Sequence, residues 1–377
     1  MPNPARPAAS ARAPRAVPVL VVAALAGWSA AVAAVEPESV LAASRRLVPL
    51  GPWPAGDERG MGNTIGPGTH LRCGWHLSQP KARSYELSHL RSNTMPKSPF
   101  SGPYTIRYKP TAALPFTSHA FNGETYADGA EPAQQATQID ALGHFAFLDR
   151  PWDGQGEAPV AGARYYGGFT QQDVKPAPDS PLLKLGMEKA PPLVTTAVLL
   201  DARARVGRGA AMKAGDLITA ADIGAMLKAQ GLAKRGLMPG DIVLFHTGWS
   251  ERWTDPGGDS TGYYAMGPGL SYDAAQLLGR ARVVAIGADV PFVDPVAEGM
   301  LQGKAAPAAG SLPNLPFTVH HHMLTQMGIH HLENVRTVDL AADRVWTSCA
   351  IVLPLRTAGA AGSAIRPVAI GVPAGRR

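Results

Sequence analysis

Short apolar runs, each bounded by glycine, proline or an acidic residue, recur through the second half of this chain. Clear examples are Val194–Leu200, Asp241–Phe245 after the turn Pro239-Gly240, and Val283–Gly287. Runs of this length that are rich in β-branched residues predict buried strands. The chain also contains 41 glycines and 35 prolines, which favour frequent turns. The sequence therefore predicts a globular protein with many short strands, and it excludes collagen, a coiled coil and general disorder.

Only a few segments predict helices between these strands. One helix is expected over Ala220–Gln230 with Thr219 as its N-cap, and a second over Tyr272–Leu278, started by Ser271. A third, short helix is expected from His320 to Met327, ending at Gly328. Further strands are predicted at Tyr104–Tyr108, Val335–Leu340 and Ala350–Leu355, whereas residues 35–135 otherwise look irregular. We expect an α/β protein with strands of mixed direction.

The first 33 residues have the pattern of a secretory signal. Arg6, Arg12 and Arg15 precede an apolar run from Ala16 to Val32, and the run ends in the small-residue pattern Ala31-Val32-Ala33. This is the order of a cleavable signal peptide, and the run is short for a bilayer span of about 20 residues. An uncleaved anchor is the alternative. We predict a signal peptide over 1–33, a periplasmic or secreted mature chain without stable membrane insertion, and one domain over 34–377.

The net charge and the cysteine content limit the classes of partner and the kinds of metal ligand that this chain can have. The formal net charge is +6, and three of the basic residues lie in the signal segment. The other basic residues are scattered along the chain. This distribution argues against a nucleic-acid partner. Cys73 and Cys349 could pair in an oxidising compartment, but their positions in the sequence do not decide whether they do. Neither cysteine belongs to a zinc-binding spacing, so a metal site here would use nitrogen and oxygen ligands.

One candidate site lies around residue 140. Gln134, Gln138, Asp140 and His144 occur within one short segment. A strand ending near Asp140 would place Gln138 and Asp140 on the same face, and a following turn would bring His144 to that side. Alone this pattern is weak, because an acid in a turn and a histidine in a core are the commoner interpretations.

A second candidate site contains five histidines and one glutamate within fourteen residues. Imidazole and carboxylate groups together suit Zn²⁺ or Mn²⁺ when thiolates are absent. A solvated helix start is the alternative for such a histidine run. The residues are His320, His321, His322, His330, His331 and Glu333.

Together the two clusters resemble the cyclase-like metal-dependent hydrolases, a family that includes bacterial kynurenine formamidase and isatin hydrolase. The family pattern is H-x-G-T-H-x-D-x-P-x-H, followed far downstream by a metal-binding His and, twelve residues later, by a Glu. In this chain His321 lies twelve residues before Glu333. The first part of the family pattern aligns with Gln134, Thr137, Gln138, Asp140 and His144.

Flanking segments carry the same resemblance over about residues 53 to 370. They comprise Asp57–Asn63, Gly240–Leu244 with Thr247-Gly248-Trp249, Pro268–Ser271, Ile286–Asp289 with Val293-Asp294, and Pro354–Arg356 with Gly362-Ser363 and Arg366-Pro367. The resemblance implies the swivelling β/β/α fold, a mixed sheet with few helices, and assembly as a homo-oligomer. It also implies hydrolysis of a small-molecule amide, lactam or related carbonyl compound, at carbon–nitrogen bonds other than peptide bonds, as in arylformamidases.

The resemblance further assigns residues to roles. Asp140, His321 and Glu333 would hold a divalent ion, Zn or Mn, with Gln138 and Gln134 as weak or outer partners. His144 would transfer protons, which suits an ordinary imidazole pKa of about 6.5. Two family histidines are replaced by Gln134 and Gln138 and the family proline by Leu142. A binding protein that has lost the metal, or a metal-using lyase or cyclase, therefore remains an alternative.

Cleavage of the signal provides a direct test. If Ala31-Val32-Ala33 directs cleavage, the mature chain should begin within one or two residues of Ala34. Mass spectrometry of the exported protein measures this end. An intact chain beginning at Met1 in the membrane fraction would contradict the prediction.

Overall fold

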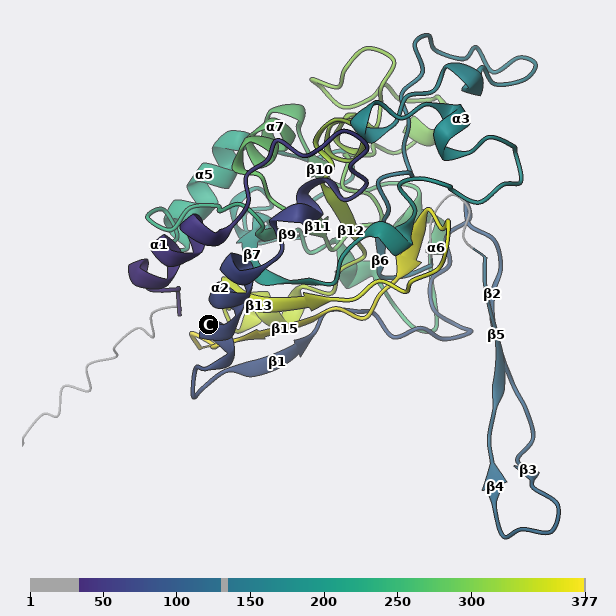
Figure 1. The fold of residues 1–377 in the computed structure, drawn as a ribbon, viewed down its shortest axis with the longest axis horizontal. Coiled ribbons are helices and arrows are strands. Elements are labelled where there is room, and N and C mark those ends of the chain that lie inside the picture. The colour runs from purple at the N-terminus through teal and green to yellow at the C-terminus, as the bar shows by residue number, and fades with distance from the viewer. Residues whose placement is uncertain (1–33, 130–134, 376–377) are drawn as a thin grey trace, which may run out of the picture. The chain divides into compact units, whose positions relative to one another are not determined.

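The computed structural model describes residues 34–129 and 135–375 (Figure 1). The predicted signal peptide over 1–33 and the candidate ligand Gln134 lie outside the described residues. Within the described residues, no helix is both long enough and apolar enough to cross a membrane.

A nine-stranded mixed sheet forms the centre of the fold. Four neighbouring strands run parallel: β7 (Leu193–Asp201), β9 (Ile242–His246), β11 (Ala285–Ala288) and β12 (His330–Glu333). On the β7 side, antiparallel pairing adds β13 (Thr347–Val352), β15 (Val368–Gly371) and β1 (Arg83–Glu86). On the β12 side it adds β6 (Gln138–Asp140) and β14 (Gly362–Ala364). The prediction of an α/β protein with strands of mixed direction is confirmed.

The central strands are buried on both faces, which explains their continuous apolar sequence. Along β7, Val198 and Leu200 join one hydrophobic cluster while Ala197 and Leu199 join another. Helices α5 (Ala220–Ala229) and α7 (Tyr272–Ala281) pack against each other and contribute apolar side chains to the first cluster. The predicted N-cap of α5 is confirmed, because the Thr219 side chain accepts a hydrogen bond from the backbone N–H of Asp222.

Two predictions about local structure were wrong. Residues 35–135 contain two helices, α1 (Glu38–Leu47) and α2 (Pro67–Leu77), besides irregular segments. Pro67 occupies the first turn of α2, where proline is tolerated because that N–H has no helical partner. The strand predicted at Val335–Leu340 is absent from those residues, which instead lead into a short helix, α9 (Val338–Ala342). The true strand lies just before it, in β12, and escaped detection because three of its four residues are polar.

The remaining short elements lie in connections. The helices are α3 (Gln171–Val174), α4 (Ala202–Arg205), α6 (Ser260–Tyr264) and α8 (Thr318–His320), and β8 (Leu217–Ile218) pairs with β10 (Gly269–Leu270). The predicted strand at Tyr104–Tyr108 is confirmed as β2, which pairs with β5 (Glu124–Asp128), and β3 (Ala112–Ala113) pairs with β4 (Ala120–Phe121). These four strands form an arm that extends away from the sheet (Figure 1).

A disulfide joins Cys73 of α2 to Cys349 of β13. The bond closes a loop with a sequence separation of 276 residues, and it fixes α2 to the strand beside β7. Disulfides of this kind persist in oxidising compartments. The structure therefore answers the question about cysteine pairing that the sequence left open.

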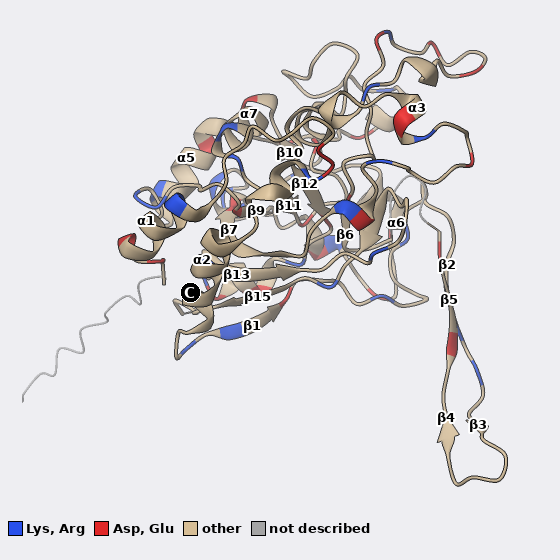
Figure 2. Ribbon diagram, viewed as in Figure 1, with Lys and Arg blue, Asp and Glu red and all other residues tan. Residues whose placement is uncertain are grey.

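Charged residues of both signs are interspersed along the ribbon (Figure 2), but four of them form a buried ion-pair network. The Arg235 guanidinium donates to both oxygens of Glu36, each at 3.0 Å, and to both oxygens of Asp241, at 2.7 and 3.0 Å. Arg72 of α2 donates to Asp241 as well, at 3.2 Å. Two carboxylates thus balance two guanidinium groups, so the network ties the segment before α1 to the start of β9 without a net buried charge.

Glu36 should contribute to stability through this network. Burial alone would raise its pKa, but the charge of Arg235 and hydrogen bonds from His76 and Arg235 lower the pKa below the usual carboxyl range. A depressed pKa in the folded state means that the stabilisation is complete above the ordinary carboxyl pKa and is lost as the pH falls below it.

We therefore expect Glu36→Gln to lower the free energy of unfolding by about 3 to 5 kcal/mol at pH 7, because a buried guanidinium loses its counter-charge. The difference from wild type should shrink below about pH 4. Guanidinium chloride unfolding at several pH values measures it. Glu38→Gln is the matched control, since the Glu38–Arg45 pair is exposed and should contribute at most about 1 kcal/mol. Equal losses in the two variants would refute the prediction.

Candidate metal centre

Two adjacent antiparallel strands present polar side chains on one buried face. In β6, Gln138 and Asp140 alternate with the apolar Ile139, and in β12 His331 and Glu333 alternate with Leu332. The register pairs Glu333 with Gln138 and Leu332 with Ile139, so side chains with the same direction lie next to each other. Ile139 and Leu332 face the hydrophobic core, and the polar side chains consequently face the opposite side.

Helix α8 adds a histidine to this face. His320 is the last residue of α8 and its side chain is buried. Asp294, in the loop after β11, accepts a hydrogen bond from His320 Nδ1 at 2.6 Å and further bonds from the backbone N–H groups of His320 and Val319. Because a carboxylate only accepts, Nδ1 carries the proton in this bond. Asp294 thereby orients the ring and leaves Nε2 directed at the two strands.

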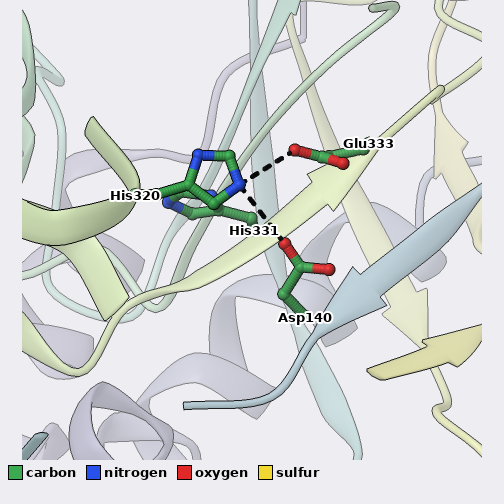
Figure 3. Close-up of side chains that lie close together, drawn as sticks. All are labelled: Asp140, His320, His331 and Glu333. Atoms are coloured by element: carbon green, nitrogen blue, oxygen red, sulfur yellow. Dashed lines mark ion pairs between the residues drawn. The ribbon is translucent and has the colours of Figure 1, made fainter. Parts of the chain in front are cut away.

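Asp140, His320, His331 and Glu333 converge on one point (Figure 3). One donor atom from each of the four lies within 4.8 Å of the others. His320 Nε2 is 3.4 Å from Glu333 Oε1 and 3.7 Å from Asp140 Oδ2. Donors that share an ion through bonds of about 2.1 Å are separated by roughly 3.4 Å in a tetrahedral arrangement. The spacing observed here is close to that value.

The four donors shift one another's pKa values. Burial and the negative charge of Asp140 raise the pKa of Glu333 to about 7, although His320 opposes the shift. Burial disfavours the charged form of His320, but the hydrogen bond to Asp294 and the nearby Glu333 carboxylate prevail and raise the pKa of His320 to about 10. Burial and the neighbouring histidines hold the pKa of His331 well below its usual value, which keeps it neutral as a metal ligand must be.

Unpartnered polar atoms show that the group fits a divalent cation. Asp140 Oδ2, Glu333 Oε1 and both ring nitrogens of His331 are buried and have no hydrogen-bond partner among the described residues. A buried polar atom without a partner costs about 1 to 3 kcal/mol, more if charged. Imidazole and carboxylate donors without thiolates suit Zn²⁺ or Mn²⁺, and two positive charges would offset the buried carboxylates.

The structure brings together some of the predicted ligands and not others. Asp140 and Glu333 meet as predicted, and Gln138 lies beside them with its amide nitrogen 3.2 Å from Asp140 Oδ1 and 2.9 Å from Glu333 Oε2. The prediction of His321 requires correction, because the imidazole at the group belongs to His320. His321 instead lies 3.0 Å from the Gln326 amide nitrogen through its Nε2 and packs on Phe147.

The difference of one residue between the predicted His321 and His320 follows from a local change of helix type. Helix α8 continues into a π-helix over His321–Met327, which ends at Gly328 with φ of +64°, as predicted for that glycine. The wider π turn changes the direction of successive side chains relative to an α-helix. The spacing of twelve residues to Glu333 therefore selects the neighbour of the histidine that joins the group. His331 was not among the predicted ligands, although its period-two spacing from Glu333 indicated that the two side chains could share a face.

His144 lies next to the group without belonging to it. The turn after β6 is closed by a hydrogen bond from the His144 backbone N–H to the Ala141 carbonyl, 3.0 Å long. The His144 ring centroid is 6.3 Å from that of His320. Burial lowers the pKa of His144, while the charge of Asp140 opposes this shift. A neutral imidazole near pH 7 follows, and such a group can accept a proton.

A pocket of about 350 Å³ borders Gln138, whose amide bonds to Asp140 and Glu333. Gln138 forms part of its wall, and four aromatic residues, Phe100, Tyr264, Phe292 and Phe317, form part of the rest. Phe317 also contacts the His320 ring, with centroids 5.8 Å apart. Apolar pockets with a few polar groups are typical of small-molecule sites, and this volume suits a small ligand.

Comparison with known proteins places the geometry in context. The family described as "Putative cyclase" matches residues 60–295. A crystal structure described as a novel cyclase has a TM-score of 0.65 at 23% identity, covering 84% of this chain and 97% of its own. Isatin hydrolase A from Labrenzia aggregata, bound to benzyl benzoate, has a TM-score of 0.50 at 17% identity, covering 79% and 97%. No curated protein matches the sequence. At these identities the solved structures show a shared fold.

Neighbouring histidines allow a sharp test of the metal group. His320→Ala should lower the affinity for Zn²⁺ or Mn²⁺ by about 100-fold or more, because it removes one of four donors, whereas His321→Ala should leave it nearly unchanged. Titration calorimetry with elemental analysis measures both. Asp294→Asn should weaken binding by about 10- to 100-fold through the lost orientation of His320. The reverse ranking of the two alanine variants would restore His321 as the ligand.

Proposed function

Because the chain belongs to the cyclase family, we propose that it is a metal-dependent hydrolase of a small-molecule amide, lactam or related carbonyl compound. The bonds cleaved would be carbon–nitrogen bonds other than peptide bonds, as in arylformamidases. The convergence of Asp140, His320, His331 and Glu333 beside an aromatic pocket is the observation that supports this function most directly.

In this proposal the four side chains hold one divalent ion, Zn²⁺ or Mn²⁺. A bound ion of this kind lowers the pKa of its water from 15.7 toward neutrality and polarises a carbonyl oxygen. Asp294 keeps the His320 ring in the orientation that directs Nε2 at the carboxylates. The pocket walls exclude bulk water and hold a planar substrate against Phe100, Phe292 and Phe317.

His144 is the proton-transfer residue of the proposal. Its ring lies beside that of His320 and its lowered pKa leaves it unprotonated at pH 7. It can therefore take a proton from the attacking water and pass it to the leaving nitrogen.

We also propose that the enzyme acts outside the cytoplasm. The signal pattern over 1–33 and the Cys73–Cys349 disulfide support this location, since such a bond persists in the periplasm or outside the cell. A homo-oligomeric state is likewise proposed on the family resemblance.

Removing the metal is the primary test of the function. Chelation should abolish hydrolysis of an active substrate from a panel of aromatic formamides, isatins, lactones and cyclic imides, and added Zn²⁺ or Mn²⁺ should restore it. Asp140→Ala should lose both metal and activity. Incorporation of ¹⁸O from labelled water into the product distinguishes hydrolysis from a lyase or cyclase reaction. Full activity in the metal-free protein would exclude the proposal.

His144→Asn tests the proton-transfer role. The variant should retain its metal and most of its substrate affinity, while kcat falls by about 10²- to 10⁴-fold, because asparagine cannot exchange a proton near pH 7. His321→Asn is the matched control, since that ring lies outside the donor group. We would measure kcat, metal content and thermal stability on one preparation. A folded, metal-loaded His144→Asn variant with near-normal kcat would remove His144 from the mechanism.

A further inference from the structure

Two polar residues lie side by side where β7 and β9 end. The register of these parallel strands places Asp201 next to His246. Side chains alternate between the two faces of a strand, so His246 lies on the same face as Leu244, which packs in the hydrophobic cluster that contains Leu332. Glu333 points to the other side of β12. The pair therefore lies on the face of the sheet opposite the metal group.

The His246 ring is held from the interior through one nitrogen. His246 Nδ1 lies 2.9 Å from Thr337 Oγ1 and 3.4 Å from Asp289 Oδ2, and both partners are buried. Burial opposes protonation of the ring, but the nearby Asp289 carboxylate prevails and raises the pKa of His246 above its usual value. At pH 6 this imidazole therefore carries a proton on each nitrogen.

The other nitrogen, Nε2, is directed at a pocket. The two nitrogens of an imidazole point away from each other, so Nε2 faces away from Thr337 and Asp289. It has no hydrogen-bond partner among the described residues, and unlike both ring nitrogens of His331 it is not sealed in by protein atoms. His246 is 4% exposed and lines a pocket of about 250 Å³, through which Nε2 therefore reaches solvent.

The charged groups that line this pocket are mostly positive. Arg203 and Arg344 line it together with His246, and Asp201 is the one acid among the described residues of its wall. Arg203 also pairs with Glu251 at 3.0 Å. A guanidinium has five N–H donors, so one partly exposed ion pair does not exhaust it. The pocket thus favours a negatively charged ligand.

We propose that this pocket binds a small organic anion, with its carboxylate hydrogen-bonded to His246 Nε2 and a flat apolar body against Trp346. A charged donor that is almost buried and has no partner binds such an acceptor strongly. The rest of the apolar wall comes from α9, namely Val338, Ala341 and Ala342. Asp201 repels a second negative charge, so a monocarboxylate fits better than phosphate. This site does not depend on the proposed function.

Benzoate and nitrobenzene test the preference for an anion, because they have nearly the same shape and differ by one charge. At pH 6 the metal-loaded mature protein should bind benzoate at least about 10-fold more tightly, as measured by titration calorimetry. Inorganic phosphate at the same concentration should not displace benzoate. His320→Ala should bind benzoate as tightly as wild type does, because the metal group lies on the other face of the sheet.

His246→Asn removes the donor but keeps the interior contact, because the asparagine amide nitrogen takes the position of Nδ1 and no atom takes that of Nε2. The dissociation constant for benzoate should rise by about 10- to 150-fold, whereas that for nitrobenzene should change by less than about 2-fold. The metal content should stay at the wild-type value. His322→Asn is the matched control, since its Nδ1 also has a side-chain partner, Gln326, and His322 is not among the residues that line this pocket.

Arg203→Gln supplies a second variant whose folding does not depend on a buried side chain. The Arg203 side chain is 36% exposed, and loss of its charge should weaken benzoate binding by about 2- to 5-fold. Equal affinity of wild-type protein for benzoate and nitrobenzene would overturn the inference, as would unchanged benzoate binding in folded His246→Asn or in Arg203→Gln. Loss of benzoate binding from His320→Ala would place the anion at the metal group and overturn it as well. Displacement of benzoate by phosphate would refute the selection of a monocarboxylate.

Discussion

The pairing of β6 with β12 places two carboxylates, Asp140 and Glu333, on one buried face, and the surrounding structure compensates for their repulsion. Two carboxylates with oxygen atoms within 4.8 Å of each other repel strongly in a low-dielectric interior when both are charged. The Gln138 amide donates a hydrogen bond to each carboxylate. The pKa of the His320 imidazole is raised to about 10, so this ring can carry a positive charge beside them. The polar residues of the site thus reduce the repulsion between these two carboxylates, and a divalent cation would reduce it as well.

The sheet was predictable where its strands are apolar. β7, β9 and β11 are buried on both faces, so their sequences are continuous runs of apolar and β-branched residues. β12 was not predictable by the same criterion, because its sequence His330-His331-Leu332-Glu333 is mostly polar. A strand that builds a site gives up the apolar pattern by which strands are recognised. The disulfide was equally hidden, since only the fold brings Cys73 close to Cys349.

The site was predictable to the level of the segment but not of every side chain. Asp140 and Glu333 could be found because the sequence around them resembles the family pattern, which gives both positions a metal-binding role. His320 could not be told from His321, because the π-helix changes the side-chain directions within the histidine run. Asp294 bonds to His320 from a distant loop, and such a contact leaves no local spacing in the sequence.

The position of Glu36 gives the first of the described residues a structural role. Its carboxylate pairs with Arg235 in the interior, and the nearby Ala34 carbonyl accepts a hydrogen bond from Thr347 of β13. A truncation that removed Glu36 would leave the two buried guanidinium groups of Arg72 and Arg235 with one carboxylate, that of Asp241, between them. The interior of the fold therefore depends on a residue at the start of the described chain that lies 199 positions from its partner Arg235 in the sequence.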